Sequence, residues 1–493
     1  MMQSKHNAEA LIELGYGVVR GRHCEGSTTW YSIPFAAAPI GELRFAPPEP
    51  PLRLTGVLDC SSPGAVAPQT PSRLRGVMGD FSAPQDEDCL TVTVTVPDGG
   101  RARKPVLVWL HGGAFMTGGA PISWYAGDRL ACEGDIVVVG VNYRLGALGF
   151  LCHPEVASGN MALLDQQAAL RWVRDHIASF GGDPGSVTVC GQSAGAASIA
   201  HLLAMPDAGG LFQRYILQSA PLGLAPLPLA EAVENAEVLF DELSLGAGNR
   251  RRQMQEMQPE RILAAQGATL LRRARALDLK PGEQYLPFRP VADGVILPAA
   301  GASAHAAAAG LKDVLIGWTR EEYASFAAFD PRVQNLEKAP LPGAVADKLL
   351  ARRPGASAAD LVSDYHSEIM FVQSSIEWAG RAADAARRVF VYRFDWQSPN
   401  AMLGSCHCIE LPFVFGTWVS FADAPMIERA DIARISRIGA QMRRAWLQFV
   451  NAGSPNGQGL PYWPAFNRAR PAMMRISEVF ELAEAASSFS HAG

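Results

Sequence analysis

The middle of the chain alternates between short apolar runs and stretches with helical periodicity. Apolar runs lie at residues 106–110, 136–141 and 186–190. Between the second and the third run, over 162–180, leucine and valine recur every three or four positions, which is the spacing of a helix. A second helix is expected over 194–205. Further apolar runs lie at 215–218, 314–317 and 389–394. Buried strands that alternate with helices predict an α/β fold, with a large, mostly parallel central sheet flanked by helices.

Composition supports a large core and disfavours two kinds of partner. The 493 residues are 48% hydrophobic and 18% charged, which is ample apolar material for a packed domain. The net charge is −5, whereas a general nucleic-acid binder normally carries a basic excess. The apolar runs are far below the ~18 residues that span a bilayer, and residues 1–10 lack the apolar segment of a secretory signal. We therefore expect no nucleic-acid partner, no membrane association and a cytoplasmic location.

Eight cysteines are spread through the chain, too thinly for a disulfide framework. The closest group is Cys406, His407 and Cys408. On an extended segment the two sulfur atoms would face away from the histidine, because successive side chains alternate. We therefore predict no metal site, and the chemistry inferred below needs no organic cofactor.

The strongest local motif is Gly-Gln-Ser-Ala-Gly at residues 191–195, between the predicted strand at 186–190 and the predicted helix at 194–205. A nucleophile elbow needs this context, since a sharp strand-to-helix turn pushes the serine hydroxyl out of the sheet. The turn brings the residues on either side close together, so they must be very small. The motif predicts Ser193 as a nucleophile, with the Ala194 N–H available to an oxyanion. The alternative is an ordinary glycine-rich turn with an inert serine.

A second glycine-rich motif, His-Gly-Gly-Ala-Phe at 111–115, leaves the predicted strand at 106–110. Small residues at this place let backbone N–H groups point into a site, as in the partner oxyanion loop of lipases and esterases. The alternative is again an ordinary turn.

A serine nucleophile needs a histidine as base and an acid that orients it. In this architecture the order along the chain is Ser, then Asp or Glu, then His. The histidines after Ser193 are His201, His305, His366, His407 and His491. His201 would lie in the helix of the elbow and point away from its own serine. The alanine run around His305 and the terminal position of His491 disfavour those two, and position alone leaves His366 and His407 open.

The motifs in this order resemble the type-B carboxylesterases, the carboxylesterase–cholinesterase group of the α/β-hydrolases. The resemblance runs from about residue 33 to residue 463. It rests on PIGELRF (39–45), EDCL (87–90), HGGAF (111–115), NYRLGALGF (142–150), GNMALLDQ (159–166), FGGDP (180–184), GQSAG (191–195), LFQRYILQS (211–219), IGWTREE (316–322) and HCIELPFVF (407–415). It implies one α/β-hydrolase domain over residues 1–493, with helical lid insertions roughly at 221–310 and 324–385.

The resemblance also implies the remaining site residues. The histidine of the family lies just before the Glu-Leu-Pro-Phe run, which selects His407, and its acid is the last carboxylate of the Ile-Gly-x-x-Arg stretch, which selects Glu322. The matching oxyanion donors are the backbone N–H groups of Gly113, Ala114 and Ala194. Two ion pairs are implied as well: Arg144 with Asp165, and Arg44 with Glu87.

The sequence departs from the family at several positions. Gln192 stands before the nucleophile, where glutamate is usual, and Tyr323 replaces the glycine after the acid. A tyrosine there would be strained if the position required a positive φ. Cys89 matches a half-cystine of secreted members, but Ala67 stands where its partner is expected, so this disulfide is predicted to be absent.

We expect a serine carboxylesterase that hydrolyses neutral esters of small molecules through an acyl-enzyme intermediate. Short stretches also resemble bacterial members that hydrolyse aryl carbamates, so an aryl carbamate or amide hydrolase with the same triad is the alternative. A non-catalytic cholinesterase-like binding protein is a remote alternative, because all three triad positions are kept. The expected pocket walls are Phe115, Gln192, Leu222, Phe326 and Phe415, and no oligomeric state is predicted.

Overall fold

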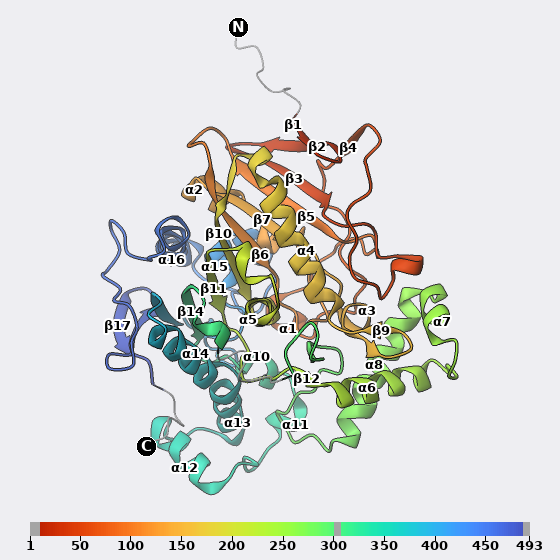
Figure 1. Ribbon diagram of the computed structural model, residues 1–493. Coiled ribbons are helices and arrows are strands. Elements are labelled where there is room, and N and C mark those ends of the chain that lie inside the picture. The colour runs from red at the N-terminus through yellow and green to blue at the C-terminus, as the bar shows by residue number, and fades with distance from the viewer. Residues whose placement is uncertain (1–9, 300–306, 487–493) are drawn as a thin grey trace.

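The computed structural model describes residues 10–299 and 307–486. In these ranges a 13-stranded sheet forms the centre of the molecule, in the order β1-β2-β3-β5-β7-β6-β10-β11-β14-β15-β16-β17 with β4 beside β2 (Figure 1). The strands from β7 to β16 are parallel, and antiparallel strands complete both ends. The strands are β1 Ala10–Leu14, β2 Gly17–Cys24, β3 Ser27–Pro34, β4 Val57–Asp59, β5 Thr91–Pro97, β6 Lys104–Leu110, β7 Val137–Val141, β10 Gly182–Gln192, β11 Arg214–Gln218, β14 Asp313–Thr319, β15 Val389–Phe394, β16 Ala472–Ile476 and β17 Phe480–Glu484.

Helices connect and cover these strands. They are α1 Arg75–Met78, α2 Asp128–Gly134, α3 Gly146–Phe150, α4 Met161–His176, α5 Ala194–Ala204, α6 Leu229–Glu242, α7 Arg250–Glu256, α8 Pro259–Ala276, α10 Ala324–Ala327, α11 Pro331–Gln334, α12 Gly343–Arg352, α13 Ala358–Ser367, α14 Gln373–Asp384, α15 Leu411–Phe415 and α16 Ile432–Ala452. Two short strand pairs, β8 Cys152–His153 with β9 Ala157–Ser158 and β12 Leu227–Pro228 with β13 Val291–Ala292, lie outside the main sheet.

The central strands are buried on both faces. Successive side chains of a strand point to opposite faces, and in β6 Val106 and Val108 pack in one apolar cluster with residues of α4 and α5. Leu107 and Trp109 pack in a second cluster with residues of α2, α15 and α16. The predicted α/β architecture, with helices on both faces of a mostly parallel sheet, is confirmed.

Two predicted boundaries were wrong in detail. The helix expected over 162–180 ends at His176 and continues as a 3-10 turn over Ile177–Phe180. The strand expected at 186–190 begins earlier, at Gly182, because its register against β6 shifts between Gly182 and Val187 and the first residues pair separately.

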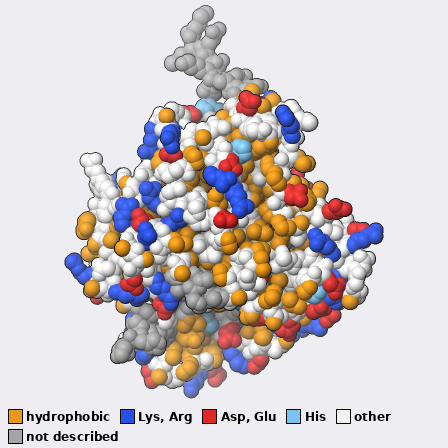
Figure 2. Space-filling view, viewed as in Figure 1, with side chains coloured by type: hydrophobic (Ala, Val, Ile, Leu, Met, Phe, Trp, Pro, Cys, Tyr) orange, Lys and Arg blue, Asp and Glu red, His pale blue; other side chains and the backbone are white. Residues whose placement is uncertain are grey.

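Helices α6 to α8 follow β11 in the chain, and α10 to α14 follow β14. In Figure 1 α6, α11, α12 and α13 lie below the sheet and α7 lies at its right, whereas α14 packs against β14 and β15. These helices fall in the two segments, 221–310 and 324–385, that the sequence analysis treats as insertions, although residues 300–306 lie outside the described ranges. No helix within those ranges combines the length and apolar character needed to cross a membrane. Acidic and basic side chains are interspersed with apolar ones on the face seen in Figure 2.

Both predicted ion pairs are confirmed. Arg144 donates from Nη2 and Nε to the two carboxylate oxygens of Asp165 at 2.6 and 2.8 Å, with both side chains buried. Arg44 forms an equivalent two-point contact with Glu87, with Nε at 2.7 Å from Oε1. These pairs fix the loops after β7 and before β5.

Candidate active site

Ser193 lies in a sharp turn between β10 and α5. Its φ of 55° and ψ of −123° are unusual for an L-residue. Hydrogen bonds hold the turn, since the Ser193 N–H donates to Gln218 and the Ala197 N–H donates to the Ser193 carbonyl oxygen, both at 2.9 Å. A Cβ at Gly191 would lie 2.6 Å from the carbonyl carbon of Gly195. The requirement for glycine that the sequence motif implied is therefore steric.

Three side chains from three loops meet at this turn. The Ser193 hydroxyl lies 2.8 Å from His407 Nε2, and His407 Nδ1 lies 2.5 Å from Glu322 Oε2. Ser193 follows β10, Glu322 follows β14, and His407 precedes α15. His407 and Glu322 are 1% and 0% exposed, so water does not compete for their contact. The arrangement can move a proton from the serine oxygen to the imidazole while a carboxylate stabilises the resulting cation.

The two adjacent glutamates point in different directions. Glu322 Oε1 accepts a hydrogen bond from the Thr319 N–H at 2.8 Å, which leaves Oε2 for His407. Glu321 instead accepts from the Ser405 N–H at 2.8 Å and contacts Arg320. Tyr323 has a φ of −81°, so the strain that its substitution for glycine could have caused is absent.

The other candidate base lies elsewhere. His366 lies in α13 and stacks on the ring of Tyr323, with 4.7 Å between the ring centroids. Burial lowers the pKa of His366. His201 lies in α5, whereas His305 and His491 lie outside the described residues. In the described part of the chain no three His, Cys, Asp or Glu side chains are grouped to hold a metal.

Three backbone N–H groups belong to residues that border the same cavities as Ser193. Ala194 begins α5, and Gly113 and Ala114 lie in the turn after β6 with φ values of 116° and 56°. No hydrogen bond from these three N–H groups to a described residue is present, so they remain available to an anion. A Cβ at Gly113 would lie 2.0 Å from the Thr117 carbonyl oxygen, which excludes any other residue there. Free donors of this kind stabilise the oxyanion of a tetrahedral intermediate.

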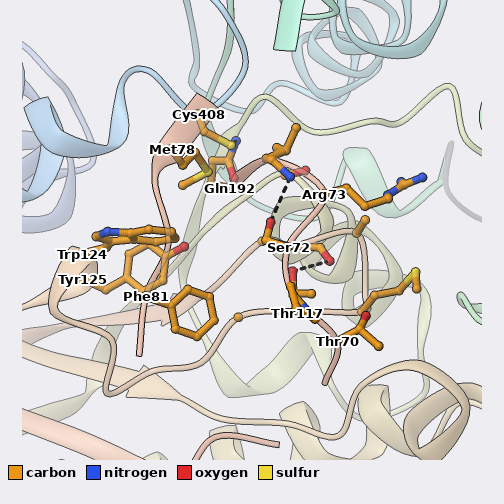
Figure 3. A pocket seen from close by; sticks show the side chains of 18 of the residues that line it. Thr70, Ser72, Arg73, Met78, Phe81, Thr117, Trp124, Tyr125, Gln192 and Cys408 are labelled. Atoms are coloured by element: carbon orange, nitrogen blue, oxygen red, sulfur yellow. Dashed lines mark hydrogen bonds between the residues drawn. The ribbon is translucent and has the colours of Figure 1, made fainter. Parts of the chain in front are cut away.

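Two cavities meet at Ser193. Both are bordered by Arg73, Ala114, Ser193 and Phe326. The first cavity continues along Met78, Phe81, Met116, Trp124, Tyr125, Gln192 and Cys408, part of which Figure 3 shows. The second continues along Phe115, Leu224, Gln284, Leu286, Tyr323, Met370 and Phe371. The mostly apolar lining suits aromatic or aliphatic substrates.

Three of the five expected wall residues line these cavities, namely Phe115, Gln192 and Phe326. The other two expectations were wrong. Leu222 lines a separate cavity beside His201, because the chain turns after Pro221. Phe415 is buried in the core, with its ring centroid 4.8 Å from that of Trp109.

Sequence reasoning missed the walls that come from the loop at 70–81, from the turn at 124–125 and from residues 284–286. No local signal identifies these residues. They come from irregular segments far apart in the sequence, which the fold alone brings to the serine.

Nearly the whole chain, residues 8–489, matches the family model described as the carboxylesterase family. The chain belongs to the carboxylesterase family. It is therefore a carboxylic ester hydrolase with the α/β-hydrolase fold.

Individual members of the family are similar over almost their full length. A probable N-octanoylanthranilate hydrolase of Rhodococcus erythropolis is 41% identical over 457 residues, covering 91% of this chain and 93% of its own. Phenmedipham hydrolase of Pseudarthrobacter oxydans is 34% identical over 478 residues, covering 92% of each chain. The solved structure of a carboxylesterase of Geobacillus stearothermophilus has a TM-score of 0.82 at 34% identity, covering 96% of this chain and 97% of that one.

Gln192 is a neutral neighbour of the triad in this member of the family. Its Nε2 lies 3.3 Å from His407 Nε2 and donates to the Cys408 sulfur at 3.3 Å. Gln192 is 1% exposed. The negative charge of a carboxylate at this position would therefore interact with the His407 imidazole with little screening by water. With glutamine, this position brings no negative charge to the cavity.

Glu410 is a buried carboxyl group behind the triad. It is 0% exposed, and its Oε1 lies 3.5 Å from Gln218 Nε2. Its Oε2 has no hydrogen-bond partner among the described residues. Burial, with a smaller contribution from the negative charge of Glu322, raises the pKa of Glu410 to about 7.

Proposed function

We propose that this carboxylesterase uses Ser193 as its nucleophile, His407 as its base and Glu322 as the orienting acid. His407 Nε2 takes the hydroxyl proton as Ser193 Oγ attacks the ester carbonyl carbon, and the same nitrogen then returns the proton to the leaving alcohol. Water hydrolyses the acyl-enzyme by the same route. The observation that carries the proposal is the continuous contact from Ser193 Oγ through His407 to Glu322, at 2.8 and 2.5 Å.

The N–H groups of Gly113, Ala114 and Ala194 serve as the oxyanion hole in this proposal. Their support is position, since all three lie beside Ser193 and donate no hydrogen bond to a described residue. Loss of a single such donor typically lowers kcat by about 10²–10³-fold.

Neutral esters with an aromatic or aliphatic part are the proposed substrates, because apolar and aromatic side chains dominate both cavities. Helices α6 to α8 and α10 to α14 serve as a cap over these cavities. Phe326, Met370 and Phe371 support this role, because they come from the segment at 324–385 and line the second cavity. We further propose a cytoplasmic location, supported by the eight cysteines, all of which are free thiols.

Amide or aryl carbamate hydrolysis is a second candidate function. The relative from Rhodococcus erythropolis is named for N-octanoylanthranilate and the relative from Pseudarthrobacter oxydans for phenmedipham. The same triad and acyl-enzyme chemistry serve these bonds. The intact triad argues against a non-catalytic binding protein.

The test compares p-nitrophenyl esters of rising chain length with a matched anilide and a phenylcarbamate. An ester hydrolase should show the highest kcat/KM on one of the esters, and an anilide or carbamate that exceeds every ester would favour the second function. Ser193→Ala should abolish the burst of p-nitrophenol and labelling by organophosphates, leaving about 10³–10⁴-fold catalysis over water. Turnover of the folded variant at the full rate would refute Ser193 as nucleophile.

A further inference from the structure

Arg73 is the one charged side chain among the described residues that line the two cavities at Ser193. It comes from the irregular segment before α1 and borders both cavities. In Figure 3 it extends on the side of the first cavity opposite Trp124 and Tyr125. A substrate bound at Ser193 in either cavity therefore has Arg73 among the residues that line its site.

The Arg73 guanidinium has no acidic partner in the described ranges. No carboxylate there lies within 4.0 Å of it, and none of its N–H groups donates a hydrogen bond to a described residue. Arg144 and Arg44, by contrast, each bind both oxygens of one carboxylate. An arginine has five N–H donors in a planar fork that matches a carboxylate. Arg73 therefore keeps that fork without a hydrogen-bond partner among the described residues.

The surroundings of Arg73 strengthen a contact with an anion. Arg73 is exposed, and the protein packed against it lowers the pKa of its guanidinium. The guanidinium still carries its charge at neutral pH. The one titratable group that influences the pKa of Arg73 is the Tyr323 phenol. This phenol is neutral, and its hydroxyl donates to the Gly282 carbonyl oxygen. Gln192 adds no negative charge to the cavity wall, so Arg73 is the charged side chain that a bound substrate would meet among the described lining residues.

We propose that Arg73 binds a carboxylate carried by the substrate, so that this enzyme takes esters with an aromatic or aliphatic part and one carboxylate near the scissile bond. The proposal rests on the serine hydrolase function proposed above and extends it to anionic substrates. Because Arg73 borders both cavities, the carboxylate belongs either to the leaving group or to the acyl group. The recognition is a charge-assisted, two-point hydrogen bond in both cases.

Two matched substrate pairs test the proposal and separate these cases. For the leaving group, 3-carboxyphenyl butanoate is compared with its methyl ester. For the acyl group, monophenyl glutarate is compared with phenyl methyl glutarate. The measured quantity is the ratio of kcat/KM for the acid to kcat/KM for its methyl ester. Arg73→Met should lower this ratio about 10- to 100-fold for one pair, mainly through KM, the range typical of a hydrogen bond to a charged group.

Two further variants distinguish contact from general charge. Arg73→Lys keeps the positive charge but not the fork, and should retain part of the ratio. Arg75→Met removes an exposed arginine two residues along the chain that lines neither cavity, and should leave the ratio unchanged. A ratio that is unchanged in Arg73→Met, or that falls equally in Arg75→Met, overturns the proposal.

A binding measurement separates failure of this proposal from failure of the proposed function. If the wild-type protein hydrolyses none of the neutral esters, the serine hydrolase function fails. Calorimetric titrations with 3-hydroxybenzoate, for the leaving group, and with glutarate, for the acyl group, then still test Arg73, because they require no turnover. The dissociation constant of one of these ligands should rise about 10- to 100-fold in Arg73→Met, and equal affinity of the two proteins for both ligands would reject the assignment.

Discussion

Replacing Glu322 with glutamine should lower kcat by up to about 10⁴-fold, whereas the same change at Glu321 should leave kcat within about threefold. The exchange at Glu322 preserves size and shape. The Thr319 N–H, which now donates at 2.8 Å, would keep the new amide oxygen on its side. The amide nitrogen would then face His407 Nδ1, at the place where the carboxylate lies 2.5 Å away.

The amide nitrogen is a donor, so Nδ1 of the imidazole would have to accept. The proton would move to Nε2, the nitrogen that lies 2.8 Å from Ser193 Oγ. That tautomer cannot take the serine proton, and the variant also lacks the negative charge that stabilises the imidazolium. A loss of about 10⁴-fold is known for this change in a serine triad and corresponds to about 5.4 kcal/mol of transition-state free energy.

Glu321 supplies the matched control. It lies next in the chain and contacts Arg320, but it binds the Ser405 N–H rather than the imidazole. Its pair with Arg320 is partly exposed and contributes at most about 1 kcal/mol to stability. The assay is steady-state hydrolysis of p-nitrophenyl butanoate, with circular dichroism as the check of folding. Equal losses in the two variants, or a Glu322→Gln enzyme within tenfold of wild type, would refute the assigned acid.

Two stability predictions follow from buried charges. Asp165→Ala should lower the free energy of unfolding by about 3–5 kcal/mol, because it leaves Arg144 buried without its partner; Asp175→Ala, which breaks the exposed pair with Arg174, should cost less than about 1 kcal/mol in the same urea titration. The pKa of Glu410 is raised from its ordinary value of 4.5, which applies to the unfolded chain, to about 7 in the folded protein. The folded protein then keeps a proton that the unfolded chain loses, so the wild-type free energy of unfolding should fall between these pH values by about 3 kcal/mol. Glu410→Gln cannot ionise and should gain about that much relative to wild type between pH 4.5 and 8; a pH-independent difference would contradict the buried titration.

Sequence patterns identified the elements whose side chains face a uniform environment. The runs at 106–110 and 389–394 are mostly apolar because both faces of their strands are covered. Any central strand of such a sheet needs this composition, so the pattern identifies the strand without its place in the strand order. The glycines of the elbow are local requirements too, since the atoms that exclude a Cβ at Gly191 belong to Gly195 and Ala196, within five residues. Such features can be inferred without the fold.

The cavity walls could not be inferred in this way. Phe415 and Phe326 are both phenylalanines in apolar segments near triad residues, yet Phe415 packs against Trp109 in the core and Phe326 lines both cavities. Arg73 lies in a polar, irregular segment where an arginine is unremarkable as sequence. Only the folded chain shows that no carboxylate of the described residues lies beside it.

The sequence by itself determined the α/β architecture and the serine elbow, because each depends on residue types at fixed separations along the chain. The two buried ion pairs were implied only by the family resemblance, and the structure confirms them. Residue pattern left the choice between His366 and His407 open until the family resemblance was added. The tertiary structure places His407 at Ser193 and His366 against Tyr323. The reason is physical: a triad is assembled from loops that follow different strands, and their convergence depends on strand order and sheet twist, which no local spacing encodes.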